Sequence, residues 1–389
     1  MSEFVDGNAL TLLESGRQYF PALEAACDEA RHEIHLETYI FEDDVAGRRI
    51  ADALVRAAQR GVATHVLVDG YGCKTLSSRI VSAFKDAGVR FLVYRPDIAP
   101  WRAPRQRLRR MHRKLAVIDA RIAFVGGINV IDDMHTPGHT PPRFDYAVQV
   151  EGPLLEYIYS AMKRLWVIVQ LTQLGGGWPE LENDPEPEVA RRGQQRAAFL
   201  VRDNLWHRND IEEAYLLAIA QARSEILIAS SYFFPGSSFR HALAQAAARG
   251  VRVVLLLQGR VEYRLLHYAS RALYGTLLEA GIEIHEYHKS FLHAKVAVID
   301  RAWATVGSSN IDPLSLLLAR EANLVVDDPR FAEELITSLQ AAIDGGAEQV
   351  RAESWRKRPF LARVAHWTCY GFARLLTGLS AYGQAQEFA

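Results

Sequence analysis

The side chains best suited to chemistry occur in two copies of one pattern: a histidine, a lysine two residues later and an aspartate five residues after that lysine. Residues two apart on an extended strand face the same side, so each histidine is expected to point with its lysine. Each copy is followed at the same interval by a glycine turn and an asparagine. Such a repeat predicts a functional site, although two core strands repeated for structural reasons are the alternative. The copies consist of His112, Lys114, Asp119 and Asn129, and of His293, Lys295, Asp300 and Asn310.

Two such sets brought face to face would suit phosphodiester transfer. This reaction needs a nucleophile, a proton donor for the leaving oxygen, and positive or hydrogen-bonding groups around the phosphate oxygens. One imidazole would attack phosphorus to form a phosphohistidine, while the other, protonated, would donate to the departing alkoxide and then deprotonate the incoming hydroxyl. The two lysines, with Asn129 and Asn310, would hold the phosphate oxygens. The scheme requires neither a metal nor a cofactor.

A catalytic histidine usually needs a carboxylate that fixes its tautomer and stabilises its cation. Asp145 and Glu321 are the candidates, because each begins a β-rich run at a similar position after its motif. The alternative for both is a surface acid at a strand end. Asp119 and Asp300 are expected at the far ends of their strands from the histidines, so we interpret them as structural.

The elements that must position these residues are themselves repeated. Ala30 to Ile34 matches Ala222 to Ile226, and in each half strand-like and helix-like runs then alternate. Gly61 and Gly250 are placed as helix stops. The order predicts an α/β fold of two tandem, similar domains. Tyr39 and Tyr232 occupy matched positions after repeated strands and are expected in the core, with ligand binding as the alternative.

Turn and linker composition between residues 171 and 188 places the domain boundary near residue 190, and the repeat is exhausted near residue 347. We therefore expect an N-terminal domain at 1–190, a C-terminal domain at 191–347 and a basic, aromatic tail at 348–389. The tail combines arginines with apolar residues, as an interfacial membrane helix does. A helix docked on the domain core is the alternative.

Composition limits the function classes. The chain has 389 residues and 49% hydrophobic content, and 45 Lys and Arg nearly balance 46 Asp and Glu, so no bulk positive field marks it as a nucleic-acid binder. Three scattered cysteines argue against a disulfide framework or a cysteine-based metal site. The N-terminal residues do not resemble a secretory signal, and no apolar run is long enough to span a membrane.

The paired motifs resemble those of the phospholipase D superfamily, and more narrowly those of bacterial cardiolipin synthases. The narrower resemblance rests on Gly126-Gly-Ile-Asn129, on Gly307-Ser-Ser-Asn310-Ile-Asp-Pro313, on Glu37-Thr-Tyr-Ile-Phe41, and on Asp145 followed by Val150-Glu-Gly-Pro153. It covers about residues 8 to 345. The sequence departs from the family by lacking the N-terminal membrane helices of many members, like the shorter soluble branch, and by having Gly127 where the general superfamily motif has Ser.

This resemblance implies two pseudo-twofold-related domains with the active site at their interface. It also implies transfer of a phosphatidyl group between two phosphatidylglycerol molecules, which yields cardiolipin and glycerol. His112 would be the nucleophile and His293 the acid and base, although pseudo-symmetry leaves this assignment open. A phospholipase D that releases phosphatidic acid, or a nuclease or other phosphodiesterase, is the alternative function.

An arginine-rich run from Arg102 to Arg113 precedes and enters the first motif. It predicts contact with anionic phospholipid headgroups, with a solvated loop or nucleic-acid contact as alternatives. Within the site, Arg110, Arg113 and Ser308 are assigned to substrate binding. The expected partners are therefore an anionic phospholipid and a membrane surface, with no nucleic acid, and the expected location is peripheral, on the cytoplasmic side of a bacterial inner membrane.

Overall fold

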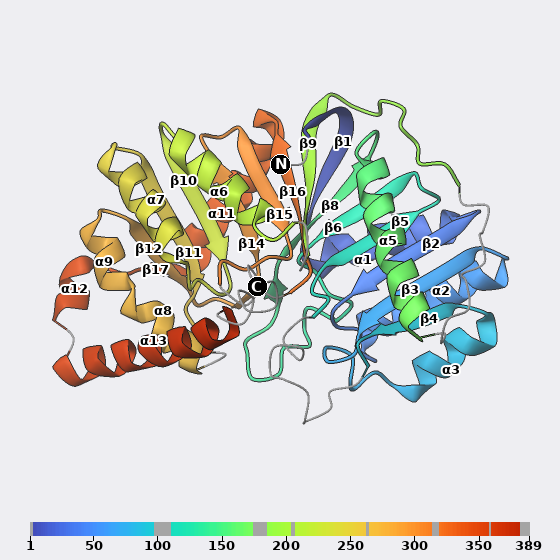
Figure 1. The fold of residues 1–389 in the computed structure, drawn as a ribbon, viewed down its shortest axis with the longest axis horizontal. Coiled ribbons are helices and arrows are strands. Elements are labelled where there is room, and N and C mark those ends of the chain that lie inside the picture. Colours follow the sequence, from blue (N-terminus) through green and yellow to red (C-terminus); the bar gives the residue numbers. More distant parts are fainter. Residues whose placement is uncertain are drawn as a thin grey trace, which may run out of the picture.

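The computed structural model describes residues 3–96, 110–173, 185–203, 207–261, 264–312, 319–357 and 359–381. The predicted fold class is confirmed, since two halves repeat the same order of strands and helices (Figure 1). The N-terminal half contains β1 (Val5–Glu14), α1 (Ser15–Glu29), β2 (Glu33–Thr38), α2 (Val45–Gln59), β3 (Ala63–Asp69), α3 (Ser78–Ala87), β4 (Arg90–Tyr94), β5 (Lys114–Ile118), β6 (Ile122–Gly126), β7 (Arg143–Phe144), β8 (Tyr146–Glu151) and α5 (Leu155–Gln173).

The C-terminal half repeats this order and adds helices at its end. It contains β9 (Gln195–Arg202), α6 (Asp210–Gln221), β10 (Glu225–Ser230), α7 (Ser237–Ala248), β11 (Arg252–Gln258), α8 (Arg264–Ala272), α9 (Tyr274–Glu279), β12 (Glu283–Tyr287), β13 (Phe291–Leu292), β14 (Lys295–Ile299), β15 (Trp303–Gly307), β16 (Glu321–Asp327), α11 (Pro329–Gly346), β17 (Ala347–Gln349), α12 (Ala352–Arg356) and α13 (Phe360–Ala381). The stretch around residue 190 has no helix or strand, and β17 continues the sheet past residue 347.

Local sequence signals account for where several helices begin and end. The Asp44 side chain accepts the Gly47 N–H at the start of α2, and Asp328 does the same for Phe331 in α11. Gly61 and Gly250 follow α2 and α7 with φ values of 90° and 89°, a left-handed conformation that favours glycine. Both helices therefore stop where the sequence predicted, and each next strand starts at a matched position.

One sheet of 15 strands runs through both halves. In each half three strands are parallel, β2-β3-β4 and β10-β11-β12, and the motif strands β5 and β14 pair antiparallel with β2 and β10. The halves join where β1 pairs antiparallel with β9. Because β15 and β16 also contact β6 and β8, the sheet turns back on itself at this junction. One hydrophobic cluster contains buried residues from the strands of both halves and from α5 and α11, and it fills the space between the facing parts of the sheet.

Helix α13, which forms most of the predicted tail, lies along α8 at the edge of the C-terminal half (Figure 1). His366 and Ala373 are buried in this contact, and the Arg374 guanidinium donates to the Pro235 carbonyl at 3.0 Å. The helix is therefore docked on the protein. Its remaining surface exposes apolar side chains, namely those of Val364, Trp367, Phe372 and Leu375. Within the described ranges, no helix is long and apolar enough to cross a membrane.

Candidate active site

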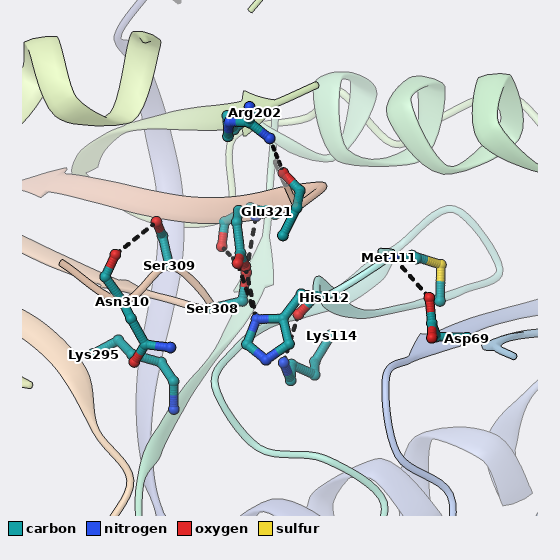
Figure 2. A network of polar contacts seen from close by, with 12 residues as sticks. Asp69, Met111, His112, Lys114, Arg202, Lys295, Ser308, Ser309, Asn310 and Glu321 are labelled. Carbon is teal, nitrogen blue, oxygen red and sulfur yellow. Dashed lines mark hydrogen bonds and ion pairs between the residues drawn. The ribbon is translucent and has the colours of Figure 1, made fainter. Parts of the chain in front are cut away.

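His112 lies immediately before β5 and is held by the opposite half. Its backbone N–H donates to the Arg320 carbonyl at 2.9 Å, and its Nδ1 lies 3.0 and 3.1 Å from the two carboxylate oxygens of Glu321 (Figure 2). Lys114 donates from Nζ to the His112 carbonyl. The imidazole keeps 18% of its surface exposed, so one edge of the ring remains accessible beside a fully buried carboxylate.

His293 has the same arrangement with the roles of the halves exchanged. Its backbone N–H donates to the Phe144 carbonyl at 2.8 Å, and its Nδ1 lies 2.5 Å from Asp145. Lys295 approaches more closely than Lys114 does, with Nζ 2.8 Å from His293 Nδ1 and 3.3 Å from the Asp145 carboxylate. The imidazole is 13% exposed.

Each histidine thus takes its carboxylate from the other half of the chain. The sequence predicted both carboxylates, but the pairing depends on the fold, which brings β7 alongside β13 and Arg320 alongside Met111. When Nδ1–H donates to a carboxylate, the neutral imidazole carries its lone pair on Nε2. His112 is therefore oriented to present Nε2 as a nucleophile or base, and His293 presents Nε2 when its Nδ1–H donates to Asp145 and Nδ1 does not accept from Lys295.

Burial and the lysines make charge unfavourable on these rings. Burial, aided by Lys114 and opposed by Glu321, holds the pKa of His112 below its usual value. Burial and the adjacent Lys295 lower the pKa of His293 to about 3, although Asp145 opposes them. The site without substrate therefore favours two neutral imidazoles at neutral pH, and His293 is the harder one to protonate.

The same balance affects Lys114 and Asp145. Burial, with a contribution from Lys295, lowers the pKa of Lys114 to about 7 even though nearby carboxylates oppose it. Burial alone would raise the pKa of Asp145, yet Lys295 and His293 hold it below its usual value. Asp145 is consequently ionised at neutral pH, whereas Lys114 can lose its proton at a pH close to neutral.

The two carboxylates are supported differently. Glu321 is fully buried and accepts the Ser308 hydroxyl at 2.5 Å. Ser308 was predicted to bind substrate, and this stays a prediction; in the structure its side chain has no exposed surface and contacts Glu321 and the Ala322 carbonyl. Figure 2 also shows the Arg202 guanidinium donating to a backbone carbonyl beside Glu321. Burial lowers the pKa of Arg202 to about 10, so it stays charged, and no sequence signal had marked it.

Gly127, the departure from the superfamily pattern, has a steric explanation in Asp145. A Cβ atom at this position would lie 2.4 Å from an Asp145 carboxylate oxygen, far inside contact distance. The aspartate side chain is shorter than that of glutamate, so its carboxylate stays close to the neighbouring backbone. Glycine at 127 accommodates Asp145, whereas the longer Glu321 leaves room for the Ser308 side chain in the other half.

The asparagines of both motifs are buried beside the histidine strands. The Asn129 side-chain oxygen accepts the Ile40 N–H at 3.1 Å, and the Asn310 oxygen accepts the Ser231 hydroxyl at 2.9 Å. These contacts orient the two amides. A phosphate oxygen requires a donor, which each amide has in its nitrogen.

The two arginines that were predicted to bind substrate, Arg110 and Arg113, each form an ion pair with a buried carboxylate. Arg113 is buried and forms a two-pronged ion pair with Glu37, with a further bond to the Ala161 carbonyl at 3.0 Å. It lies between His112 and Lys114 on an extended segment and so faces away from them. Its assignment to substrate stays a prediction, and these contacts do not support it. Arg110 is nearly buried, with Nη1 3.8 Å from Asp69; the rest of the basic run, residues 102–109, lies outside the described residues.

Tyr39 is a site residue that the sequence predicted as core. Its ring lies edge-on to His112 with centroids 4.8 Å apart, and Lys114 Nζ is 5.5 Å from the ring centre. The predicted match with Tyr232 is also one residue out of register, because Phe41 pairs with Val130 where Phe233 pairs with Ile311. Tyr39 therefore corresponds to Ser231, which contacts Asn310.

Asp119 and Asp300 end their strands with φ values of 52° and 50° and accept backbone N–H groups of the turn before β2 or β10. These bonds tie the motif strand to its neighbour. The interpretation of both aspartates as structural stays a prediction. Hydrogen bonds to the backbone of the neighbouring strand are what such a structural role would need.

Among the described residues, one group of side chains lies close enough to hold a metal ion. Its ligand atoms, from the buried Glu33, His35 and His65, are within 4.8 Å of one another. Two cations already face this group, with Lys163 Nζ 3.8 Å from Glu33 and an Arg90 nitrogen 3.2 Å from His65. A third positive charge would be repelled by both, so we assign no metal to the group.

Two α/β halves that contribute paired His, Lys and Asn sets to one site define a phosphodiester-transferring enzyme of the phospholipase D superfamily. A sequence profile described as "Cardiolipin synthase, PLD-like domain" matches residues 23–136 and 215–343, and the chain belongs to this family. Cardiolipin synthase B of Escherichia coli (strain K12) is 42% identical over 369 residues, covering 91% of this chain and 84% of that one.

A cardiolipin synthase of Halalkalibacterium halodurans is 30% identical over 378 residues, covering 95% of this chain and 71% of the relative. Among solved structures, the crystal structure of phosphatidylserine synthase from Haemophilus influenzae Rd KW20 superposes with a TM-score of 0.72. That superposition covers 97% of both chains at 14% identity and so supports the fold.

Proposed function

We propose that the protein is a cardiolipin synthase, which transfers a phosphatidyl group from one phosphatidylglycerol molecule to another and releases glycerol. The observation that carries this proposal is the exchange of carboxylates, in which His112 pairs with Glu321 and His293 pairs with Asp145. Two activated imidazoles on facing halves are what a two-step phosphoryl transfer requires. The family and the relatives supply the substrate class.

In the first step, His112 Nε2 attacks phosphorus, a nitrogen–phosphorus bond forms and the bond to the glycerol oxygen breaks. His293 gives its proton to the departing glycerol alkoxide. In the second step, His293 takes the proton of a hydroxyl on the second phosphatidylglycerol, whose oxygen attacks phosphorus and releases His112. Because Lys295 disfavours the charged form of His293, the negative phosphodiester must stabilise that cation on binding.

The remaining polar groups stabilise charge on the phosphate. Lys114 and Lys295 place two ammonium groups beside the histidines, and the amides of Asn129 and Asn310 add donors. Such preorganised groups lower the barrier where charge develops on the oxygens. The acceptor of the phosphatidyl group decides the product, since water in place of the second lipid would give phosphatidic acid.

Phosphatidylglycerol labelled in its terminal glycerol tests this function directly. We expect release of labelled glycerol together with an equivalent amount of cardiolipin from vesicles of phosphatidylglycerol. Phosphatidic acid without cardiolipin would contradict transfer and identify a phospholipase D instead. Nicking of plasmid DNA in the presence of EDTA, with no lipid product, would identify a nuclease.

We also propose that α13 lies at a membrane surface on the cytoplasmic side of the bacterial inner membrane. The support is its exposed apolar side, with Trp367 49%, Phe372 52% and Leu375 58% exposed, on a helix whose other side is docked. Arg356 and Lys357, just before it, are exposed cations. Apolar and aromatic side chains beside cations are typical of interfacial helices on anionic lipid.

Sedimentation with phosphatidylglycerol vesicles tests the membrane contact. Replacing the exposed Trp367 and Leu375 with Glu should reduce the bound fraction several-fold, about 1 kcal/mol or more. Point substitutions are preferable to removal of residues 356–389, because α13 also covers apolar surface of the C-terminal half. Leu217→Glu is a matched control, since Leu217 is 44% exposed on α6. Equal binding by all variants would rule out α13 as the contact.

A further inference from the structure

Asp69, the last residue of β3, is a buried carboxylate that contacts the peptide unit before His112. Its Oδ2 accepts the Met111 N–H at 2.9 Å (Figure 2), and its Oδ1 accepts the N–H groups of Tyr71 and Gly72 at 2.8 and 3.1 Å. Asp69 has no exposed surface. These three hydrogen bonds all come from backbone N–H groups beside the site, so Asp69 acts on the position of the chain.

The geometry of residues 110–112 explains why this position matters. Successive peptide groups of an extended segment point to opposite sides. The Arg110 carbonyl accepts the Arg320 N–H at 2.7 Å, and the His112 N–H donates to the Arg320 carbonyl, so one edge is paired with the opposite half. The Met111 N–H points to the other edge, where Asp69 takes the place of a neighbouring strand.

This segment therefore lies between two anchors. Arg320 immediately precedes Glu321, which contacts the His112 ring, and Asp69 fixes the same segment from the N-terminal half. Met111 is fully buried with Leu67 and Leu165, which resists displacement of the peptide. Loss of the Asp69 contact would leave the buried Met111 N–H without this acceptor, which destabilises the position of the segment.

The C-terminal half has the same design with a different side chain. Asp69 is opposite Tyr94 in the sheet where Gln258 is opposite Tyr287, which makes Gln258 the counterpart of Asp69. Gln258 Oε1 accepts the Leu292 N–H, the peptide before His293, at 3.4 Å. On the edge that faces away from the opposite half, the His293 segment thus has a long bond to a neutral amide, and the His112 segment has a shorter bond to a carboxylate.

We infer that Asp69 is a positioning residue for His112, which sets the imidazole at the distance from Glu321 and from phosphorus that the first chemical step needs. Gln258 has the corresponding but weaker role for His293. Asp69 touches neither substrate nor the reacting atoms. The kinetic part of this inference rests on the proposed function, whereas the geometric part does not.

Asp69→Asn tests the inference with little change in shape. An amide has only one acceptor atom, so either Met111 or the Tyr71–Gly72 turn would face an N–H₂ group and lose its bond. Because chemistry depends steeply on alignment, kcat for cardiolipin formation should fall about 10- to 100-fold while KM changes less than about 2-fold. The matched variant Gln258→Ala, which loses one weaker bond, should reduce kcat less than about 5-fold.

Proton NMR supplies a second readout that needs no substrate. The downfield Nδ1–H signal of His112, identified by its loss in His112→Gln, should shift in Asp69→Asn, while the His293 signal stays in place. If Asp69→Asn leaves both the His112 signal and kcat unchanged, the inference is overturned. It is also overturned if kcat falls by the expected amount while the His112 signal does not shift. If Asp69→Asn fails to fold, the same two measurements are made on Asp69→Glu, which keeps the carboxylate but has a longer side chain.

These readouts separate the inference from the proposed function. If wild-type protein forms no cardiolipin, the proposed function fails, and the shift of the His112 signal alone decides whether Asp69 positions the ring. If wild-type protein is active and the signal does not move, the positioning inference fails while the function stands.

Discussion

His112 and His293 are held by the same backbone contacts, but the side chains around them differ. Each donates its N–H to a carbonyl of the opposite half and pairs Nδ1 with the carboxylate that follows that carbonyl. Beyond these shared contacts, the residues at matched positions differ. Around His112 they are Glu321, Ser308, Tyr39, Arg113, Glu37 and Asp69. Around His293 the corresponding residues, in the same order, are Asp145, Gly127, Ser231, Ala294, Ala229 and Gln258.

The difference teaches that a hydrogen bond between the ring and a carboxylate is maintained while the residues that produce it vary. A longer acid reaches His112 and leaves space for a serine, and a shorter acid reaches His293 and excludes any side chain at 127. Both lysines donate to the backbone carbonyl of their own histidine, and Lys295 also contacts the Asp145 carboxylate. The two imidazoles consequently differ in how readily they accept a proton: both favour the neutral form without substrate, and His293, the proposed acid, needs the bound phosphodiester to stabilise its cation.

The largest effect is expected from removing either imidazole. His112→Ala and His293→Ala should each lower kcat for cardiolipin formation by at least about 10⁴-fold, because the two rings act as a unit. Both rings are partly exposed, so the variants should keep the thermal transition of the wild type. Substantial turnover by either variant would show that the halves are not both required.

The second prediction concerns the residues beside the two carboxylates, Gly127 next to Asp145 and Ser308 next to Glu321. Gly127→Ser should lower kcat about 10²- to 10³-fold, since the added side chain displaces Asp145 from His293. Ser308→Ala should lower it only about 10-fold, through loss of a hydrogen bond to a charged group worth about 1.5 kcal/mol.

A double variant sharpens this test. Gly127→Ser combined with Asp145→Glu recreates the pairing of the other half and should recover part of the activity lost by Gly127→Ser alone. If the double variant is worse than both single variants, steric compensation between residues 127 and 145 is the wrong explanation for the difference.

The third prediction concerns stability. Arg113→Ala leaves the Glu37 carboxylate buried without its ion pair and should reduce the free energy of unfolding by about 3–5 kcal/mol. The double variant with Glu37→Ala resembles the C-terminal half, where both matched residues are alanine, and should regain part of that loss. Urea denaturation measures both changes. No difference between the single and double variants would contradict a buried, coupled pair.

The smallest expected effect is a displacement of the pH profile. The pKa of Lys114, lowered by burial to about 7, means that the ammonium is lost as pH rises above that value, so kcat/KM should fall on the alkaline side. Lys114→Arg keeps a charge at all these pH values and should move the alkaline limb upward. Lys295→Arg is the control, and its limb should stay in place. An identical limb in Lys114→Arg would assign it to another group.

The sequence alone predicted the α/β fold, because helix stops such as Gly61 and Gly250 mark the same order of elements in both halves. It also indicated the histidines, lysines and asparagines through their register. It could not predict which acid serves which histidine, since Asp145 and His293 meet only when β7 lies beside β13. Long-range pairing of this kind leaves no local pattern.

Other residues could have been interpreted better from local rules. Strand alternation already turns Arg113 away from His112 and Lys114, which weighs against its predicted contact with substrate. The error at Tyr39 came from matching Tyr with Tyr, one residue out of the register that Ala30 and Ala222 set and that the bridge pairs show. Asp69 ends its strand where Gln258 ends the matched one, a signal visible in the sequence but without meaning until Met111 is placed beside it.

The exchange of carboxylates also bears on how such a chain evolves. One half by itself carries a histidine without its acid and an acid without its histidine, so an ancestral single-domain protein would have needed a second identical copy. In a symmetric dimer every substitution occurs on both sides of the axis. Fusion into one chain removes that restriction, and each half can then specialise, one toward attack on phosphorus and the other toward proton transfer.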